Sequence, residues 1–163
     1  MYQWAVYFHV LIAMFWMGGM LFTIAVIVPA TRTRLARYKP LLFHELGTRF
    51  SRISWVLFPL LAFTGVLALF GKGYRTAHLV TVDFWSSGYG CLLAGKLMLF
   101  LLVLVISALH DYWLGPKAVS ILEQEHEKTG QNSNKVVMAS RWAGRATFIL
   151  GLAIVFLAVL LVR

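Results

Sequence analysis

The sequence predicts an all-α protein whose four transmembrane helices form one bundle. Of its 163 residues, 60% are hydrophobic and only 13% are charged, whereas roughly a quarter of the residues in soluble domains are charged. Four apolar runs are each long enough to cross about 30 Å of hydrocarbon as a helix. The chain length favours a single domain, residues 1–163, so we expect the four runs to pack together in a lipid bilayer.

The first predicted span has no basic segment before it. It continues through Thr23–Val28 without a small-residue cleavage pattern, so we expect a retained helix and not a signal peptide. Before the second span, Leu42, Leu46 and Phe50 recur at helical spacing and predict an inner continuation of that helix. The four spans are predicted at residues 4–29, 53–70, 89–114 and 143–162.

The connections between the spans differ in composition. Gly71–Gly90 is rich in glycine, serine and aromatic residues, which predicts an ordered cap. The third helix is expected to extend through Ser120 to Lys128, with a kink at Pro116. Thr129–Lys135 is polar and turn-rich, so we expect a mobile connection there.

Basic residues cluster in two connections, which the positive-inside rule places in the cytoplasm. Both termini are therefore predicted to lie outside, in a multi-pass protein of a bacterial inner membrane. The net charge of +9 reflects this topology, because no basic and aromatic side chains alternate as they do on nucleic-acid surfaces. The basic residues are Arg32, Arg34, Arg37, Lys39, Arg49 and Arg52, and then Lys117, Lys128, Lys135, Arg141 and Arg145.

Two ionisable residues are predicted at a similar depth near the outer surface. His9 and Lys96 each lie about six or seven residues inside the outer end of a span, roughly 10 Å deep at 1.5 Å per residue. Ionisable side chains at membrane depth are costly, and their default interpretation is functional. His9 and Lys96 are therefore candidates for one shared site.

His9 shares a helix face with small, aromatic and sulfur-containing side chains. Ala13, Trp16, Met20 and Thr23 all lie within about 40° of it. A haem needs such a face, with a nitrogen ligand, a small residue beside the ring and aromatic groups at its edge. A histidine bonded to a nearby carbonyl within an ordinary packed helix is the alternative, and both interpretations stay open.

A second candidate layer lies near the inner surface. His110 lies about four residues inside the inner end of the third span, and His44 faces it if the second helix begins near Leu41. Two histidines on facing helices suit a bis-histidine haem b, with Arg49 and Arg52 placed to meet its propionates. A solvated His44 and arginines that serve only the charge bias are the alternative.

The remaining candidates are more isolated. His78, in the outer connection, is a candidate second ligand above His9, whereas His126 lies among acidic residues and is expected on a solvated face. Three thioethers on the first helix are soft ligands that suit Cu(I), although methionine also fills apolar helices. Cys91 cannot form an intramolecular disulfide, and no hydrolytic triad or phosphate-binding loop is present. The thioethers belong to Met14, Met17 and Met20.

Several short motifs resemble one membrane family over nearly the whole chain. The pattern His9-x6-Trp16-x2-Gly19 is similar to the first helix of HemJ-type protoporphyrinogen oxidases and the related CopD-like copper-resistance proteins. Further similar motifs are Arg52 before span two, Gly95-Lys96-Leu97 in span three, Ala108-Leu109-His110-Asp111 with Leu114-Gly115-Pro116 at its end, and Arg141-Trp142 before span four.

The resemblance implies a four-helix membrane domain. The HemJ branch implies that His9 and Lys96 take part in haem binding or activity, and the CopD name implies copper transport. The fourth span departs from the HemJ pattern, because this chain has Gly144-Arg145-Ala146-Thr147 where that branch has an Asn-Glu-Leu-Pro-like stretch. This departure argues against protoporphyrinogen IX oxidation.

The leading hypothesis is a membrane-integral b-type cytochrome with one or two haems, and any enzyme activity would be that of a haem-dependent oxidoreductase. Its partners would be a quinone or a redox protein, and it could act as a homo-oligomer or as a subunit of a complex. A copper-handling permease, a HemJ-like oxidase and a purely structural subunit are the alternatives. Candidate iron ligands are His9, His110, His44 and His78, and further cofactor contacts are Lys96, Arg52 and Trp16.

Overall fold

The computed structural model describes residues 2–124 and 133–161. Within these ranges the chain is almost entirely helical and contains no strand. The elements are α1 (Tyr2–Phe22), the π-helix η1 (Thr23–Ile27), α2 (Val28–Ala30), the 3₁₀ helix η2 (Ala36–Tyr38), α3 (Lys39–Gly71), α4 (Thr76–Leu79), α5 (Val82–Ser86), α6 (Gly88–Leu109), the π-helix η3 (His110–Leu114), α7 (Gly115–Gln124) and α8 (Ser133–Leu160).

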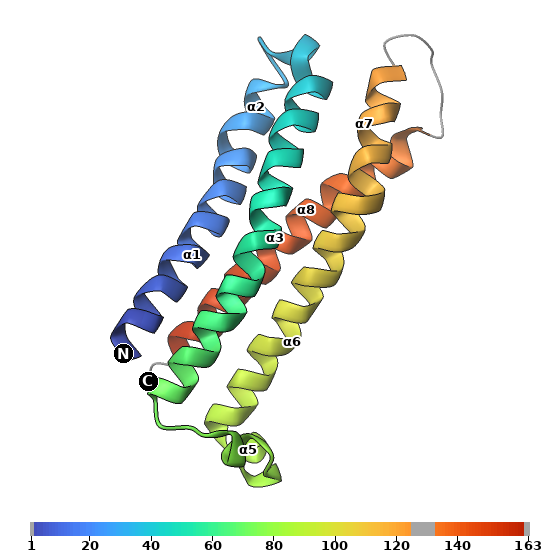
Figure 1. Ribbon diagram of the computed structural model, residues 1–163. Coiled ribbons are helices and arrows are strands. Elements are labelled where there is room, and N and C mark those ends of the chain that lie inside the picture. Colours follow the sequence, from blue (N-terminus) through green and yellow to red (C-terminus); the bar gives the residue numbers. More distant parts are fainter. Residues whose placement is uncertain (1, 125–132, 162–163) are drawn as a thin grey trace.

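Consecutive elements join into four rods that are long and apolar enough to cross a membrane, which confirms the predicted fold class. They are Tyr2–Ala30, Ala36–Gly71, Gly88–Ile121 and Lys135–Leu160. The end that carries α4 and α5 is called the outer end below, and the end that carries α2 and α7 the inner end (Figure 1). The second, third and fourth rods extend beyond their predicted spans at the inner end. A rod of 36 residues is about 54 Å long at 1.5 Å per residue and exceeds the hydrocarbon thickness of about 30 Å.

In two rods the helix continues beyond the apolar run, and the position of a proline is compatible with this continuation. In the second rod, α3 begins at Lys39, near the start that the spacing of its apolar residues predicts, and Pro40 lies in its first turn, where its missing N–H is not needed. The third continues from α6 through η3 into α7, and the π-helical turn directly precedes Pro116. Proline cannot donate a backbone hydrogen bond, so the turn before it is locally disturbed, at the place where a kink is predicted.

One predicted connection is shorter than expected. Thr129–Lys135 was predicted to be a mobile loop, but the backbone at residues 133–135 already belongs to α8. Serine and asparagine, which occupy positions 133 and 134, are favourable residues at helix starts. The rest of that segment, and His126, lie outside the described residues.

The outer connection is ordered, as predicted. The ring of Tyr74 stacks on that of Tyr89 with centroids 4.9 Å apart, and Phe84 is buried beside both. The indole N–H of Trp85 donates to the Leu79 carbonyl at 2.9 Å. This aromatic cluster holds α4 and α5 against the start of α6.

Gly90 is required at the junction of α5 and α6. A methyl group there would overlap with the carbonyl oxygen of Phe84, and backbone atoms cannot move aside as a side chain can. Gly90→Ala is therefore expected to lower the free energy of unfolding by about 2 kcal/mol, as for overpacked sites. Unfolding in a mixed detergent and SDS titration measures this loss. Gly88→Ala is the matched control, because nothing lies within 4 Å of a methyl group there, and an equal loss in both variants would contradict the assignment.

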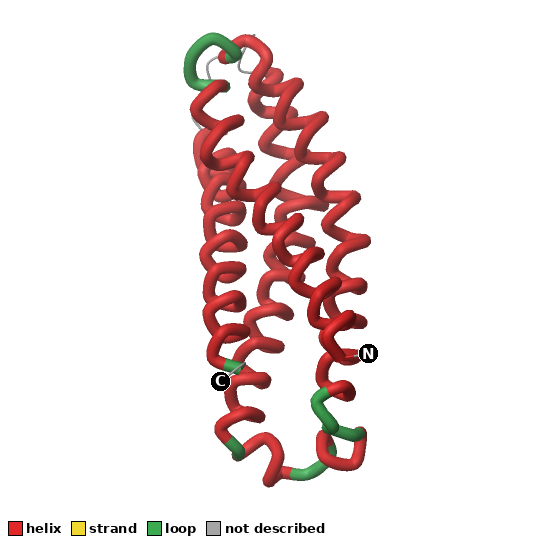
Figure 2. The backbone as a smooth tube through the Cα atoms, turned by 90° about the vertical axis from the view of Figure 1, so that its left-hand side faces the viewer, coloured by secondary structure: helices red, strands yellow, loops and turns green. Residues whose placement is uncertain are grey.

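The four rods associate as two pairs. Helix α1 packs along α3 (Figure 1), and α6 packs along α8. Figure 2 shows the whole bundle of long helices from a second direction. Large side chains join the pairs at mid-height, where Trp16, Phe58 and Val103 form the buried core. The ring of Phe58 lies 5.3 Å from that of Trp16 and 6.1 Å from that of Phe100. The junction between the pairs is therefore mainly aromatic.

The distribution of polarity is that of a membrane protein. Large apolar side chains point outward on all four rods, among them Trp4 (68% exposed) and Met98 (75%). Several hydroxyl groups are buried instead, and three of them satisfy their donor on the helix itself by bonding the carbonyl four residues earlier. These are Ser54 to Phe50 at 2.8 Å, Thr64 to Leu60 at 2.7 Å and Thr147 to Ala143 at 3.0 Å. Apolar side chains that face outward are stable only in lipid.

Candidate functional site

A histidine held by a threonine forms the centre of the outer polar layer. His9 on α1 lies with its Nδ1 atom 2.9 Å from the hydroxyl oxygen of Thr64 on α3. The hydroxyl proton of Thr64 is directed to the Leu60 carbonyl at 2.7 Å, so the hydroxyl oxygen accepts a hydrogen bond from Nδ1–H of His9. In this tautomer Nε2 of His9 carries the lone pair, and the backbone of Leu61 also lies within hydrogen-bonding reach of the imidazole. An imidazole oriented through its other nitrogen is the usual arrangement of a metal ligand.

A glycine gives the imidazole its place. A methyl group on Gly65 would lie 3.3 Å from the Cε1 atom of His9, which is closer than ordinary van der Waals contact. The bare backbone of α3 therefore lets the ring lie close to that helix. Neither Thr64 nor Gly65 was among the predicted site residues. The available signal was the position of Thr64, which is as many residues from the outer end of α3 as His9 is from that of α1.

Lys96 on α6 belongs to the same layer. It is half-buried and lies within electrostatic range of His9. Among the described residues, no hydrogen bond or ion pair engages its ammonium group. The structure therefore brings together the two residues that the sequence predicts at one depth: an imidazole, and an amino group that has no counter-ion in the described part of the chain.

Trp16 fills the middle of the bundle. It is 5% exposed and packs on Phe58, with Met20 against the same cluster. The aromatic face beside His9 that the sequence predicts thus serves the core of the protein.

Among the described residues, neither His78 nor Arg52 makes a recorded contact with His9 or Lys96. His78 is exposed, and its Nδ1 atom accepts the backbone N–H of Arg75 at 3.0 Å. It caps the short helix α4 and makes no described contact with His9. Arg52 is exposed on α3.

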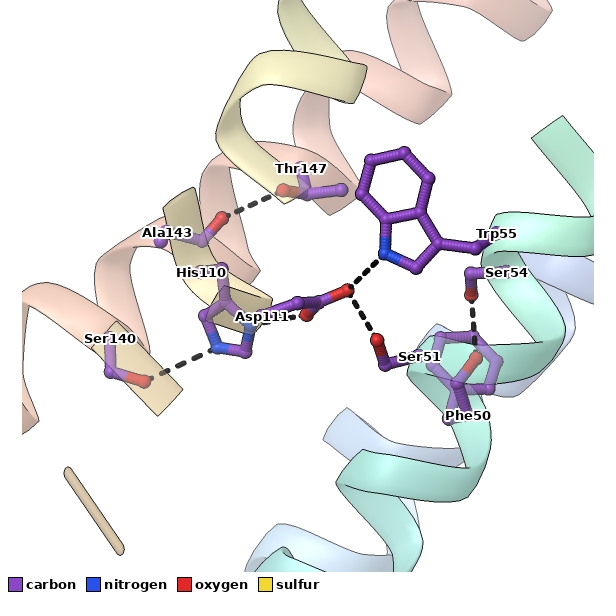
Figure 3. Close-up of polar contacts among 9 residues, drawn as sticks. All are labelled: Phe50, Ser51, Ser54, Trp55, His110, Asp111, Ser140, Ala143 and Thr147. Carbon is purple, nitrogen blue, oxygen red and sulfur yellow. Dashed lines mark hydrogen bonds and ion pairs between the residues drawn. The ribbon is translucent and has the colours of Figure 1, made fainter. Parts of the chain in front are cut away.

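The inner polar layer has Asp111 at its centre, as Figure 3 shows. One carboxylate oxygen, Oδ2, accepts the hydroxyl of Ser51 at 2.6 Å and the indole N–H of Trp55 at 3.2 Å. The other, Oδ1, lies 3.0 Å from Nδ1 of His110, and Nε2 of His110 lies 3.2 Å from the hydroxyl of Ser140. The network joins α3, η3 and α8.

His110 and His44 do not form the predicted pair. Both ring nitrogens of His110 are engaged, by Asp111 and by Ser140. His44 is exposed on α3, and the next residue, Glu45, pairs with Arg49 on the same helix at 3.2 Å. The adjacent acid and histidine at the end of the third span were the sequence signal for the network. Asp111 was not predicted as part of a site.

These features define an integral, multi-pass membrane protein with two polar layers, one at each end of an aromatic core. The chain belongs to the CopD family, because the family described as Copper resistance protein D matches residues 44–161. The match covers Thr64, Lys96 and the inner network, and it begins after His9. The chain is 31% identical over 153 residues to an uncharacterized protein of Aquifex aeolicus (strain VF5). This alignment covers 94% of this chain and 90% of that protein. No solved structure matches the chain.

Proposed function

We propose that this protein is a b-type haem protein that carries electrons within the membrane, with Nε2 of His9 as an iron ligand. The observation that carries the proposal is the hydrogen bond from Nδ1 of His9 to Thr64. In that arrangement the lone pair of the second ring nitrogen, Nε2, is available to bind iron at membrane depth. Bound haem would supply one-electron transfer between ferric and ferrous iron. A quinone in the bilayer or a redox protein would be the partner.

The donor set of the outer layer favours haem over a bare metal ion. No group of three or more His, Cys, Asp or Glu residues in the described part of the chain could hold a metal ion. A bare copper ion at His9 would thus have few protein ligands, whereas haem brings four nitrogen ligands of its own and needs only one or two more. Lys96 supplies the charge to pair with a haem propionate.

The inner layer is not part of this proposal. Both nitrogens of His110 already have partners, so we propose one haem per chain, at His9.

The test is a reduced-minus-oxidised visible spectrum of the full chain purified in detergent, with a pyridine haemochrome assay to count haem. About one haem per chain is expected, either as purified or after reconstitution with haemin. A protein that carries no haem and gains none on reconstitution contradicts the proposal. Two haems per chain would contradict the single site and direct attention to His110.

Copper handling is the second candidate, and the family description favours it. Of the three thioethers on α1, Met17 and Met20 pack in the core, and Met14 is 66% exposed. This candidate predicts a colourless protein that retains Cu(I), and a loss of that copper when the three methionines are changed to leucine. Metal analysis of the same purified sample separates the two functions.

A further inference from the structure

An apolar groove lies between the third and fourth rods near the inner end. Its volume is about 350 Å³, and it opens to the outside of the bundle. Its walls are formed by Ile106, Leu109, Leu114, Trp142, Ala143 and Ala146. A groove that is open to lipid and has an aromatic side chain in its wall suits an apolar molecule taken from the bilayer.

The imidazole of His110 lies beside this groove. Two groove residues of the third rod, Ile106 and Leu114, lie about one helical turn before and after His110, so the three residues share one side of the rod. On the opposite wall, Ala143 is three residues from Ser140, whose hydroxyl lies 3.2 Å from Nε2 of His110. The side chain of His110 is 35% exposed. The groove therefore has a polar group at its edge that a bound molecule can reach.

The neighbouring carboxylate makes this polar group a hydrogen-bond acceptor. Oδ1 of Asp111 only accepts, so Nδ1 of His110, 3.0 Å away, donates the proton of that hydrogen bond. In the neutral imidazole, Nε2 then holds a lone pair and accepts the hydroxyl of Ser140. Ser51 and Trp55 keep Asp111 in place from α3, as Figure 3 shows. Another hydroxyl donor can replace that of Ser140 while the imidazole stays where it is.

The acceptor and the negative charge behind it restrict what the groove can hold. A phosphodiester headgroup is negatively charged and its oxygens only accept, so the carboxylate of Asp111 repels it. The ligand must instead donate a hydroxyl proton from an otherwise apolar body. A hydroxyl on an aromatic ring is more acidic than an aliphatic one and therefore the stronger donor, and a planar ring can also pack on the indole of Trp142 in the groove wall.

We propose that this groove and His110 form a binding site for a membrane quinol. The ring lies beside Trp142, one hydroxyl donates to Nε2 of His110 in place of Ser140, and the apolar tail extends along the groove into lipid. The oxidised quinone has carbonyl oxygens instead of hydroxyls and cannot donate, so the site prefers the reduced form. The role of the quinol as bilayer partner of the electron carrier rests on the proposed function, but its binding in this groove does not need haem.

Native mass spectrometry of the full chain in detergent, titrated with decylubiquinol or decylubiquinone, tests this site. One such hydrogen bond contributes roughly a factor of ten in affinity, so the quinol is expected to bind about tenfold more tightly than the quinone. His110→Leu removes the acceptor and should lower the quinol affinity about tenfold, with the quinone affinity unchanged. Ser140→Ala removes the competing donor and should raise the quinol affinity about threefold, a gain that misfolding cannot produce.

Two control variants separate the acceptor from the groove. His44→Leu removes an exposed histidine of α3 and should leave both affinities unchanged. Ala146→Phe keeps the acceptor but fills the groove, so it should weaken the binding of both forms. Equal affinities for quinol and quinone, or an equal loss in His44→Leu and His110→Leu, overturns the proposal. Farnesol that binds as tightly as the quinol also overturns it, because the aromatic ring would then contribute nothing.

Haem content, counted in the same sample, keeps this test separate from that of His9. A protein that binds haem but shows no preference for the quinol overturns the groove site alone. A protein that prefers the quinol but neither carries nor gains haem overturns the proposed function alone.

Discussion

His9→Ala is expected to lower the haem affinity of the protein by well over tenfold, so that the purified variant is nearly colourless. The reason is that this change removes the only imidazole nitrogen that the outer layer offers to iron, and even partners that merely orient a ligand typically account for 10–100-fold in metal affinity. Haem per chain, counted by the pyridine haemochrome assay after reconstitution, measures the effect.

Two further variants, Thr64→Val and His78→Ala, test whether the loss of haem is specific to His9 and its hydrogen bond. Thr64→Val keeps the shape of the side chain but removes the acceptor of the His9 Nδ1–H bond, so haem should bind about tenfold more weakly. His78→Ala is the matched control, because that exposed histidine bonds only to its own helix turn. If His78→Ala loses as much haem as His9→Ala, or if His9→Ala keeps its haem, the assignment of His9 as the ligand is wrong.

Asp111→Ala is expected to have the largest effect on stability, a loss of about 3 kcal/mol in the free energy of unfolding. Removing one partner of a fully buried, hydrogen-bonded charge typically costs about 3–5 kcal/mol; the side chain of Asp111 is 16% exposed, so we expect a loss at the lower end of that range. Here the donors of Ser51 and Trp55 lose their common acceptor, and His110 loses its charged partner. Unfolding in a mixed detergent and SDS titration gives the value.

Asp111→Asn separates hydrogen bonding from charge. Its amide oxygen can still accept from Ser51 and Trp55, so about 1 kcal/mol is the expected loss, comparable to one weakened charge-assisted hydrogen bond. Asp83→Ala serves as the control because that side chain is exposed in α5 and should have almost no effect. A loss in Asp111→Ala no larger than that in Asp83→Ala would show that the network does not hold the rods together.

The fold could be predicted from sequence because hydrophobic length alone decides what crosses a membrane. The apolar runs located four helices, and the spacing of Leu42, Leu46 and Phe50 located the inner extension of α3. Helix ends were harder to predict. Once a helix leaves the hydrocarbon, polar residues such as those at 133–135 are compatible with both a helix and a loop, and the surrounding packing decides between them.

The position of a residue along its helix predicts how deep its side chain lies in the membrane, but it does not predict which side chains on other helices it contacts. Depth placed His9 and Lys96 in one layer, and the structure brings them within electrostatic range. The rotation of each helix about its axis depends on packing across the bundle, which no spacing in one helix reports. For this reason sequence spacing could not show that Trp16 faces the core or that His110 contacts Ser140.

The π-helical turn η3 holds one residue more than an α-helical turn needs, and each residue of an α-helix turns the chain by about 100°. The third rod therefore changes its rotational phase at His110. Before this point, α6 packs along α8 with a mostly apolar sequence that carries Lys96. Beyond it, α7 is amphipathic and packs against α8. A deletion of one residue within η3 would restore continuous α-helical geometry, but it would turn the whole of α7 away from its present neighbour. The extra residue thus lets a single continuous helix pack against α8 along both halves, with the packing face of α7 oriented separately from that of α6.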